Sequence, residues 1–490
     1  MANCISQLTR QGLLLYFKGN PIFKNFMYIS SMKKNSSRRS FLYKTGFAAA
    51  GFYILPRHVF GRGFTAPSDK LLVAAIGIGG FAETELIHLF NTGKTEIAFL
   101  CDVDDRQAEN SRARFPKAKF YKDYRLMLQH KTTHFDAVMI SSPNHMHAPQ
   151  CMAAMQLNKH IFIQQPLSHT LQEGRMLRNA ALHYKVVTQI NNTHNSNGIH
   201  KLMHWQQANL IGDIHTIYCS TNRSLACQGI GWPKNTSSIP SQLDWNLWQG
   251  VAPAKDYING LLPTNWRAWW HYGNGVLGDM AQAILGPVFA LLNLGLPLYV
   301  ECMAVARYHQ PFTPIGYPDS SPLATHLVFT FEGKAGMPNI VLHWMDGGFQ
   351  SSNGIHFIGT KGKMVCGAYG DAPQLIPASK SMEFSDDSIE NSESIMDNTQ
   401  HKLWVEAAIA GFHSPQSKAL KYNFENSATL NECIHLGNMA IRSYDLQQKN
   451  RSGNKIFPDL SIRLNWDQSA MRVTNFDDAN QFIKKDYRLF

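Results

Sequence analysis

The sequence GIGGFA, which begins at Gly77, follows the apolar run LLVAAIG and has the spacing of a dinucleotide-binding turn. Gly77, Gly79 and Ala82 fill the fingerprint G-x-G-x-x-G/A, which allows a tight turn, close approach to a pyrophosphate and packing of a helix on a strand. A second apolar run ends in Asp102, where a carboxylate accepts hydrogen bonds from the adenosine ribose. Since it would repel a 2′-phosphate, the sequence favours NAD over NADP; Arg106 is the residue that would allow NADP.

The elements that must position these residues alternate between strands and helices. Strands are expected at 71–77, 96–103, 136–141, 160–164 and 186–190, and helices at 104–115, 123–130, 148–157 and 170–184. Continuous apolar strands are typical of a parallel sheet covered on both faces, whose ligands lie at the carboxyl ends of the strands. We therefore expect residues 69–190 to form a Rossmann domain in which GIGGFA, SPNHMH (142–147) and QQP (164–166) meet.

The turn SPNHMH contains an H-x-H pair, His145 and His147. Two histidines alone do not complete a zinc site, which takes three or four protein ligands, and no third ligand stands nearby in the sequence. We predict no metal here. The two histidines are expected to cap the next helix or to border the cofactor.

After residue 190 the pattern changes. Strands are expected at 299–306, 325–332, 339–345 and 354–359, helices at 194–210, 400–411 and 426–442, and a mobile loop at 379–398. Consecutive strands predict a mostly antiparallel sheet in a second domain, residues 191–490. Seven of the ten tryptophans fall between 205 and 270, where their rings form either sugar-binding platforms or core. Residues 284–300 are apolar but interrupted by two prolines, so a buried helix followed by a strand is expected instead of a membrane span.

The charge is confined to the N-terminal leader. Lys and Arg number 46 and Asp and Glu 35, but ten basic residues precede the first acidic one, Asp69, so the remainder has 36 − 35 = +1. This near-neutral body excludes nucleic acid as a partner. Residues 1–68 contain SSRRSFLYK followed by a short apolar run, the pattern of a twin-arginine signal, with a translation start near Met32. A periplasmic location is expected, with the twin-arginine export machinery as a partner; a basic amphipathic anchor is the alternative.

Eight cysteines are scattered along the chain without a C-x-x-C pair. Proteins exported by the twin-arginine route cross the membrane folded, and their thiols can stay reduced in a core. We therefore expect free cysteines instead of a disulfide framework.

Several longer motifs give the chain a family resemblance. They are LPRHVFGRGFTAPSDK (55–70), AAIGIGG (74–80), CDVD (101–104), SPNHMHA (142–148), LDWNLWQG (243–250), NWRAWW (265–270), GDM (278–280), MDGG (345–348) and CGAYG (366–370). With them the chain resembles the glucose–fructose oxidoreductase, inositol dehydrogenase and MocA (Gfo/Idh/MocA) family, specifically its exported bacterial members.

The resemblance implies an α/β plus α+β fold. A Rossmann domain with a doubly wound parallel sheet is followed by an open-faced, mostly antiparallel sheet with helices on one side, used for substrate and oligomer contacts. It also implies a homo-oligomer, a dimer or tetramer. The implied chemistry is hydride exchange between NAD(P) and a secondary alcohol of a sugar, cyclitol or related polyol.

The chain departs from the resemblance at the catalytic positions. Gln165 stands in QQP where the family has lysine, and Ala283 stands in GDMAQAILG where it has histidine, whereas Asp279 is retained. Loss of one such group typically costs about 10²- to 10⁴-fold in rate. We therefore expect weakened or rewired catalysis in which Asp279 orients the substrate hydroxyl and Gln165 hydrogen-bonds it. His271 or His194 is a possible replacement base.

The predicted site residues fall into three groups. The catalytic residues are Asp279, Gln165 and His271. The cofactor-binding residues are Gly77, Ile78, Gly79, Gly80, Asp102, Ser142, Pro143, Asn144, His145, Gln164 and Pro166. The substrate-binding residues are His194, Arg267, Trp269, Trp270 and Asp279. Three functions stay open: a weakened sugar-type oxidoreductase, a non-catalytic protein that binds dinucleotide and sugar, and an NAD-dependent glycosidase.

Overall fold

A computed structural model describes most of the chain from Lys70 to Phe490. Within this range it leaves out 131–133, 193–195, 305–306, 311–312, 316–318, 334–336, 348–352, 379–398, 445, 447, 450–454 and 457–460. The predicted leader, His194 and the predicted mobile loop lie outside the described residues.

The first half forms a parallel sheet of six strands in the order β3-β2-β1-β4-β5-β6. The strands are β1 (Leu71–Ile76), β2 (Thr95–Cys101), β3 (Lys119–Tyr121), β4 (Ala137–Ile140), β5 (His160–Ile163) and β6 (Thr188–Ile190). All side chains of β4 are buried, as a strand covered on both faces requires. The predicted Rossmann sheet is confirmed; β3 has only three residues and escapes a search for apolar runs.

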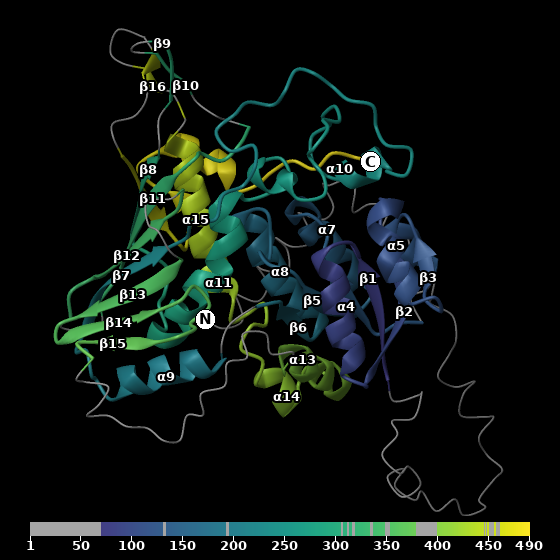
Figure 1. The fold of residues 1–490 in the computed structure, drawn as a ribbon, viewed down its shortest axis with the longest axis horizontal. Helices are drawn as coiled ribbons and strands as arrows, with labels where there is room; N and C mark the ends of the chain where they lie inside the picture. The colour runs from purple at the N-terminus through teal and green to yellow at the C-terminus, as the bar shows by residue number, and fades with distance from the viewer. Residues whose placement is uncertain are drawn as a thin grey trace, which may run out of the picture. The chain divides into compact units, whose positions relative to one another are not determined.

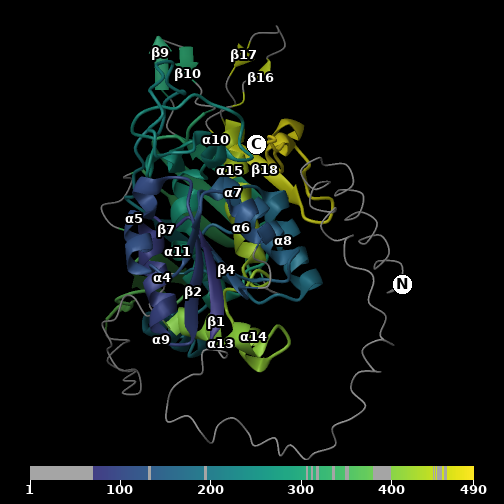
Figure 2. The same ribbon diagram turned by 90° about the vertical axis from the view of Figure 1, so that its right-hand side faces the viewer.

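Helices cover both faces of this sheet (Figure 2). They are α4 (Phe81–Asn91), α5 (Asp105–Arg114), α6 (Tyr124–His130), α7 (Asn144–Met155) and α8 (Leu171–Tyr184). A capping box fixes the start of α8, because Thr170 accepts from the backbone of Glu173 while Glu173 accepts from the backbone of Thr170.

Helix α7 begins earlier than predicted. The sequence prediction of a turn over 142–147 and a helix from 148 is wrong, because α7 starts at Asn144 and contains Pro149. Proline has no N–H, so Pro149 leaves the carbonyl of His145 without its helical donor. Lys485 Nζ donates to that carbonyl at 3.2 Å and replaces the missing bond.

The second half forms a sheet of nine strands in the order β15-β14-β13-β7-β12-β11-β8-β18-β19. The strands are β7 (Ile214–Ser220), β8 (Tyr299–Ala304), β11 (Thr325–Phe331), β12 (Ile340–Met345), β13 (Gly354–Gly359), β14 (Gly362–Cys366), β15 (Gln374–Ile376), β18 (Ile462–Asp467) and β19 (Arg472–Val473). Neighbours are antiparallel except β7 and β12, which are parallel. The predicted mostly antiparallel sheet is confirmed.

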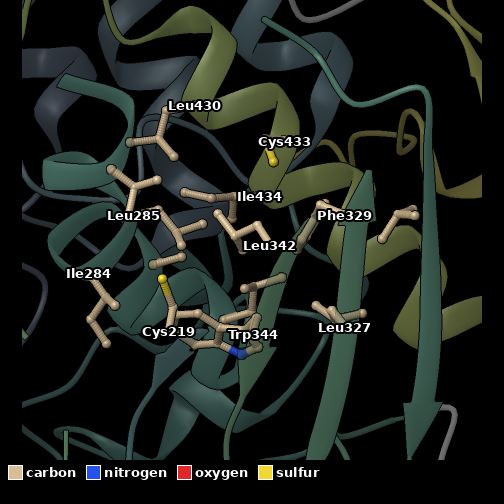
Figure 3. Close-up of a cluster of buried hydrophobic side chains, with 14 of the residues drawn as sticks. Cys219, Ile284, Leu285, Leu327, Phe329, Leu342, Trp344, Leu430, Cys433 and Ile434 are labelled. Carbon is tan, nitrogen blue, oxygen red and sulfur yellow. The ribbon is translucent and has the colours of Figure 1, made fainter. Parts of the chain in front are cut away.

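Two long helices, α11 (Gly275–Leu292) and α15 (Ala428–Tyr444), lie on one face of this sheet (Figure 1). Figure 3 shows their apolar side chains meeting those of the strands, with Ile284 and Leu285 opposite Leu342 and Trp344. Helix α11 is the one helix among the described residues that is long and apolar enough to cross a membrane, but 83% of it is buried in the protein. The predicted buried helix followed by strand β8 is therefore confirmed.

The remaining elements are short or peripheral. They are α9 (Ser196–Gln207), α10 (Trp245–Gln249), α13 (Thr399–Ala410), α14 (Pro415–Lys418), the 3₁₀ helices η3 (Asn265–Ala268) and η4 (Asp477–Phe482), and the strand pairs β9 (Arg307–Gln310) with β10 (Thr313–Ile315) and β16 (Gln448–Lys449) with β17 (Lys455–Ile456). None of the seven cysteines in the described residues forms a disulfide, as expected.

Helix α13 belongs to the core of the first half although it lies late in the sequence. Trp404 and Val405 are fully buried in one cluster with Leu86 and Phe162. His401 Nε2 bonds to Glu85 Oε2 at 2.7 Å, and both side chains are almost fully buried. The predicted boundary at residue 190 therefore does not separate the two hydrophobic cores, since a segment after residue 398 completes the first.

Candidate active site

A cleft of about 320 Å³ opens at the carboxyl ends of β1, β2, β4 and β5, the edge where a parallel sheet binds its ligands. This volume is within the range of ligand pockets, about 300–1,000 Å³. Residues from both halves of the chain line it. The predicted site residues among them are Gly77, Gly79, Gly80, Asp102, Ser142, Pro143, Asn144, Gln164, Gln165, Arg267 and Asp279.

The glycine turn between β1 and α4 has no room for a side chain at two positions and leaves open space at a third. A Cβ on Gly77, whose φ is +73°, would lie 2.7 Å from Ser142 N, and one on Gly79 would lie 2.6 Å from Gln107 Cβ. Gly80 has φ +56°, and a Cβ there would meet nothing within 4 Å although the residue lines the cleft. The turn therefore fits a bound pyrophosphate: two glycines permit the tight packing, and the third faces open space.

Asp102 follows β2 at the next strand end. Its two carboxylate oxygens accept from the backbone N–H groups of Ile78, at 2.9 Å, and Asp104, at 3.0 Å. Burial raises the pKa of Asp102 to about 6, and these backbone hydrogen bonds oppose the rise. The carboxylate is thus fixed beside the glycine turn, where a dinucleotide carries its adenosine ribose.

Arg106, the residue that would allow NADP to bind, is paired with Asp104. Its Nε donates to Asp104 Oδ1 at 2.9 Å and its Nη2 to Asp104 Oδ2 at 2.6 Å. Asp104 is 1% exposed and also caps α5 by accepting from the backbone of Arg106. This two-pronged pair holds the guanidinium and supports the predicted preference for NAD.

Two glutamines after β5 carry buried polar atoms without partners. Gln164 Oε1 accepts from Asn191 Nδ2 at 2.9 Å, but its Nε2 bonds to nothing. Gln165 Nε2 donates to the backbone carbonyl of Asp279 at 3.2 Å, but its Oε1 bonds to nothing. A buried polar atom left unpaired costs about 1–3 kcal/mol. Since both residues line the cleft, these atoms fit a ligand that completes their hydrogen bonds.

Asp279, on α11, is held by two arginines. Arg267 Nε donates to Oδ1 at 3.0 Å, and Arg223 Nη2 lies 3.1 Å from Oδ2. Each carboxylate oxygen keeps a second lone pair for a substrate hydroxyl. Two guanidiniums against one carboxylate give this end of the cleft a net positive charge.

Several predicted residues lie away from the cleft. Ile78 is fully buried, and Pro166 presents its carbonyl to His147 Nδ1 at 2.7 Å. His145 is fully buried, with Nε2 3.0 Å from the carbonyl of Trp248, and burial lowers its pKa to about 3. His271 lies 3.5 Å from Asp319. Burial lowers its pKa, and the positive charge of Lys255 adds to this, while Asp319 opposes it.

The tryptophans are mainly core. Trp269 is fully buried in an aromatic cluster with Trp245 and Tyr272, and Trp270 packs in the core beneath the nine-stranded sheet. Trp248 and Trp266 belong to the same aromatic cluster but also line the cleft. Neither Trp269 nor Trp270 is among the lining residues.

Sequence reasoning missed several lining residues. They include Lys122, Asp123 and Tyr124 at the start of α6, Trp248, Trp266, the segment 262–264, and Phe490. It also missed Arg223, which stands in no motif and reaches Asp279 only through the fold. A strand end after β3 was the one available signal for Lys122 to Tyr124, and β3 was too short to be predicted.

One group of possible metal ligands occurs among the described residues: Glu85, His88 and His401, whose ligand atoms lie within 4.8 Å of one another. His401 Nε2 and Glu85 Oε2 are only 2.7 Å apart. Tetrahedral zinc with bonds near 2.0 Å separates its ligand atoms by about 3.3 Å. The close pair is therefore a hydrogen bond, and the group contributes packing between α4 and α13.

Comparison with known proteins agrees with this architecture. Residues 71–192 match the GFO/IDH/MocA family model, described as an oxidoreductase family with an NAD-binding Rossmann fold, and residues 230–416 match the C-terminal α/β domain of that family. Over 102 residues the chain is 30% identical to inositol 2-dehydrogenase of Salmonella typhimurium, covering 20% of this chain and 30% of that relative. Over 132 residues it is 26% identical to 4-carboxy-2-hydroxymuconate-6-semialdehyde dehydrogenase of a Sphingobium species, covering 27% of this chain and 41% of that protein. The matched segments thus span less than half of either relative.

Solved structures share the fold at low identity. Biliverdin reductase from Synechocystis, solved with biliverdin and NADP⁺, aligns with a TM-score of 0.51 and 15% identity over 75% of this chain and 97% of its own. The WlbA dehydrogenase of Bordetella pertussis, solved with NADH and UDP-GlcNAcA, aligns with a TM-score of 0.51 and 12% identity over 74% of this chain and 93% of its own. With both domain models matched in order along one chain, this protein belongs to the Gfo/Idh/MocA family of oxidoreductases and carries its NAD-binding Rossmann domain.

Proposed function

We propose that this protein is an NAD-dependent oxidoreductase that exchanges hydride with a secondary alcohol of a sugar, cyclitol or related polyol, at a low rate. The observation that carries the proposal is the pair of unpaired buried amide atoms, Gln164 Nε2 and Gln165 Oε1, at the strand end of the cleft. They lie on β5's side of the glycine turn, and Asp279 adjoins Gln165. The donor Gln164 Nε2 fits an acceptor on the nicotinamide, and the acceptor Gln165 Oε1 fits a substrate hydroxyl.

Different residues along the cleft would bind different parts of the cofactor and the substrate. The glycine turn accommodates the pyrophosphate, Asp102 accepts from the adenosine ribose, and Gln164 Nε2 donates at the nicotinamide end. When bound, the nicotinamide ring supplies the acceptor or donor of hydride. Gln165 Oε1 and the free lone pairs of Asp279 accept from the substrate hydroxyl and orient its carbon.

Proton removal is the weak step of this arrangement. Gln165 is uncharged and takes no proton, and both carboxylate oxygens of Asp279 are already paired with the guanidiniums of Arg223 and Arg267. A missing general base costs about 10²- to 10⁴-fold in rate. The same observation favours a second candidate, a protein that binds dinucleotide and sugar without turnover.

We infer that the substrate carries an acidic group. The two guanidiniums beside one carboxylate leave one positive charge unbalanced within the Asp279 cluster. Arginine pairs with carboxylates and phosphates through parallel hydrogen bonds, and Arg223 is about half exposed, so it can turn toward a ligand. Uronic acids and sugar phosphates are therefore expected to bind better than the matching neutral sugars.

One experiment separates enzyme from binder. The purified protein is analysed for released dinucleotide, and absorbance at 340 nm is followed with a panel of neutral sugars, uronic acids, sugar phosphates and cyclitols. The oxidoreductase proposal is supported if the wild type shows slow turnover, Asp279→Ala abolishes it, and His271→Ala turns over at the wild-type rate. Dinucleotide binding without turnover on the whole panel supports the binder, and the absence of dinucleotide binding contradicts both.

We propose that the protein is exported to the periplasm by the twin-arginine route, on the basis of Arg38 and Arg39 before a short apolar run. The test is the double variant Arg38→Lys, Arg39→Lys in the full chain. If the protein is exported by this route, the double variant should be missing from the periplasmic fraction and should accumulate as precursor in the cytoplasm. An unchanged distribution would contradict the proposal.

We further propose a homo-oligomer built on the face of the nine-stranded sheet that α11 and α15 leave uncovered. Side chains alternate along a strand, so His343 points away from the face on which Leu342 and Trp344 are buried. Tyr218 stacks on His343 with ring centres 4.7 Å apart, and His326 Nε2 lies 2.9 Å from His343 Nδ1. Light scattering of the purified protein checks the mass; a monomer at micromolar concentration would refute the proposal.

A further inference from the structure

The last residues of the sequence run across both halves of the chain. Lys485 Nζ contacts His169 Nδ1 at 2.7 Å and Glu173 Oε1 at 3.2 Å, and Tyr487 OH donates to the same Glu173 oxygen at 2.7 Å. Arg488 then donates to the carbonyls of Gly250 and Ala252, each at 3.1 Å. These contacts fix the path of the segment up to the cleft.

The strand order tells which end of the cleft this segment reaches. Asp102 follows β2, and the two glutamines follow β5, on opposite sides of the glycine turn after β1. A dinucleotide whose pyrophosphate lies at that turn therefore has its adenosine toward β2 and β3 and its nicotinamide toward β5. The lining residues beyond Asp102 in the adenosine direction include Lys122, Asp123 and Phe490.

Phe490 is held there mainly by Arg125. The guanidinium of Arg125 lies 4.3 Å from the centre of the Phe490 ring, and its Nη1 donates to the main-chain oxygen of Phe490 at 2.6 Å. Asp123 fixes this guanidinium in turn, accepting from Arg125 Nε at 3.0 Å and from Nη2 at 2.7 Å. The ring is thus clamped on one face by a guanidinium while the residue lines the cleft.

We propose that the Phe490 ring is the stacking platform for the adenine base of the dinucleotide. The proposal rests on the dinucleotide binding of the proposed function. Every base has an aromatic face, and loss of one aromatic stacking partner typically weakens binding by about 5- to 100-fold. The Phe490 ring lines the cleft with the Arg125 guanidinium 4.3 Å and the Arg488 guanidinium 6.0 Å from its centre. Of the neighbouring lining residues, Tyr124 is only 8% exposed, and Lys122 and Asp123 have no flat apolar surface. The adenine contact therefore comes from a residue 388 positions after Asp102, since 490 − 102 = 388.

Fragments of the cofactor make the test specific. After charcoal removes co-purified nucleotide from the full chain, binding of NADH, AMP and nicotinamide mononucleotide is measured by calorimetry or fluorescence. Phe490→Ala is expected to weaken NADH and AMP about 5- to 100-fold and to leave nicotinamide mononucleotide, which lacks adenine, within about twofold. Phe490→Trp, which keeps a stacking surface, should bind AMP at least as well as the wild type.

Asp486→Ala is the matched control, since this residue is exposed on the same segment. Unchanged AMP and NADH affinity in Phe490→Ala would overturn the stacking role while leaving the proposed oxidoreductase intact. An equal loss for all three ligands would also overturn it, because it would show a general loosening of the segment. If the wild type binds none of the three, the cofactor assignment itself fails.

Discussion

Gln165 and Asp279 connect the two halves of the chain: the Gln165 amide donates to the Asp279 carbonyl at 3.2 Å and leaves its oxygen buried and unpaired. A lysine can make the same donation and adds the positive charge that polarises a substrate oxygen. Gln165→Lys is therefore expected to raise the turnover of any substrate that the wild type oxidises, by about 10²-fold. Steady-state kinetics at 340 nm measure it, with Gln165→Met as the uncharged control; equal rates for both variants would contradict the argument.

Restoring the second missing group is expected to disturb packing. Ala283 is 1% exposed on α11, so a histidine there must displace its neighbours. Overpacking of a well-packed core costs about 1–3 kcal/mol. Ala283→His is therefore expected to lower the midpoint of urea unfolding, whereas Ala283→Ser, which is closer in size, should change it little. An unchanged midpoint in Ala283→His would mean that there is space for the histidine beside Asp279. The double variant Gln165→Lys, Ala283→His would then be expected to be more active than the wild type.

Cofactor choice depends on how Asp104 holds Arg106. Asp104→Ser keeps a capping oxygen for α5 but removes the two-pronged carboxylate, so the Arg106 guanidinium becomes free to meet a 2′-phosphate. The ratio of NADPH affinity to NADH affinity is expected to rise about tenfold, which corresponds to one charge-assisted hydrogen bond of about 1.5 kcal/mol. Binding titrations measure both ligands. The gain should vanish when Arg106→Ala is added; a gain that persists would point to another phosphate contact.

The affinity for NADH should depend on pH through Asp102. Burial raises the pKa of this carboxyl to about 6, and only the ionised form offers acceptors to both ribose hydroxyls. As pH falls through 6 the group becomes protonated, so affinity falls by up to about tenfold per pH unit below the pKa and is constant above it. Titrations between pH 5 and pH 8 measure this. Asp102→Asn should bind more weakly at high pH and show a flat profile; an unchanged slope would assign the titration to another group.

Helix α13 makes one buried hydrogen bond and one exposed ion pair with the Rossmann half, which allows a matched comparison. His401→Leu leaves Glu85, 2% exposed, without its partner and should lower the free energy of unfolding by about 3–5 kcal/mol. Lys94→Ala removes the exposed pair with Glu406 and should cost about 0–1 kcal/mol. Urea titrations followed by tryptophan fluorescence compare the two. Equal losses would show that α13 is not held by its buried pair.

The fold of the Rossmann half could be predicted from the sequence alone, because the residues that specify it lie close together in the chain. The run LLVAAIG, the spacing of Gly77 and Gly79, and the position of Asp102 after the next apolar run each depend on residues close together in the chain. Strand ends of a parallel sheet meet by topology, so three turns could be assigned to one edge without coordinates. The start of α7 at Asn144 was not predictable in this way, because the carbonyl that Pro149 leaves free is satisfied by Lys485 from the far end of the chain.

The tertiary structure decided which polar groups are already engaged. Sequence motifs identified Asp279 and Arg267, but only the fold places Arg223 on the second carboxylate oxygen, so that both oxygens of Asp279 are paired with guanidiniums. Trp269 and Trp270 share a motif with Arg267, yet burial places them in hydrophobic cores instead of the cleft. Phe490 is the opposite case, because it lies in no motif and yet contacts of the final segment place it at the cleft. Hydrogen-bond partners and burial depend on residues hundreds of positions apart, and the local sequence therefore does not encode them.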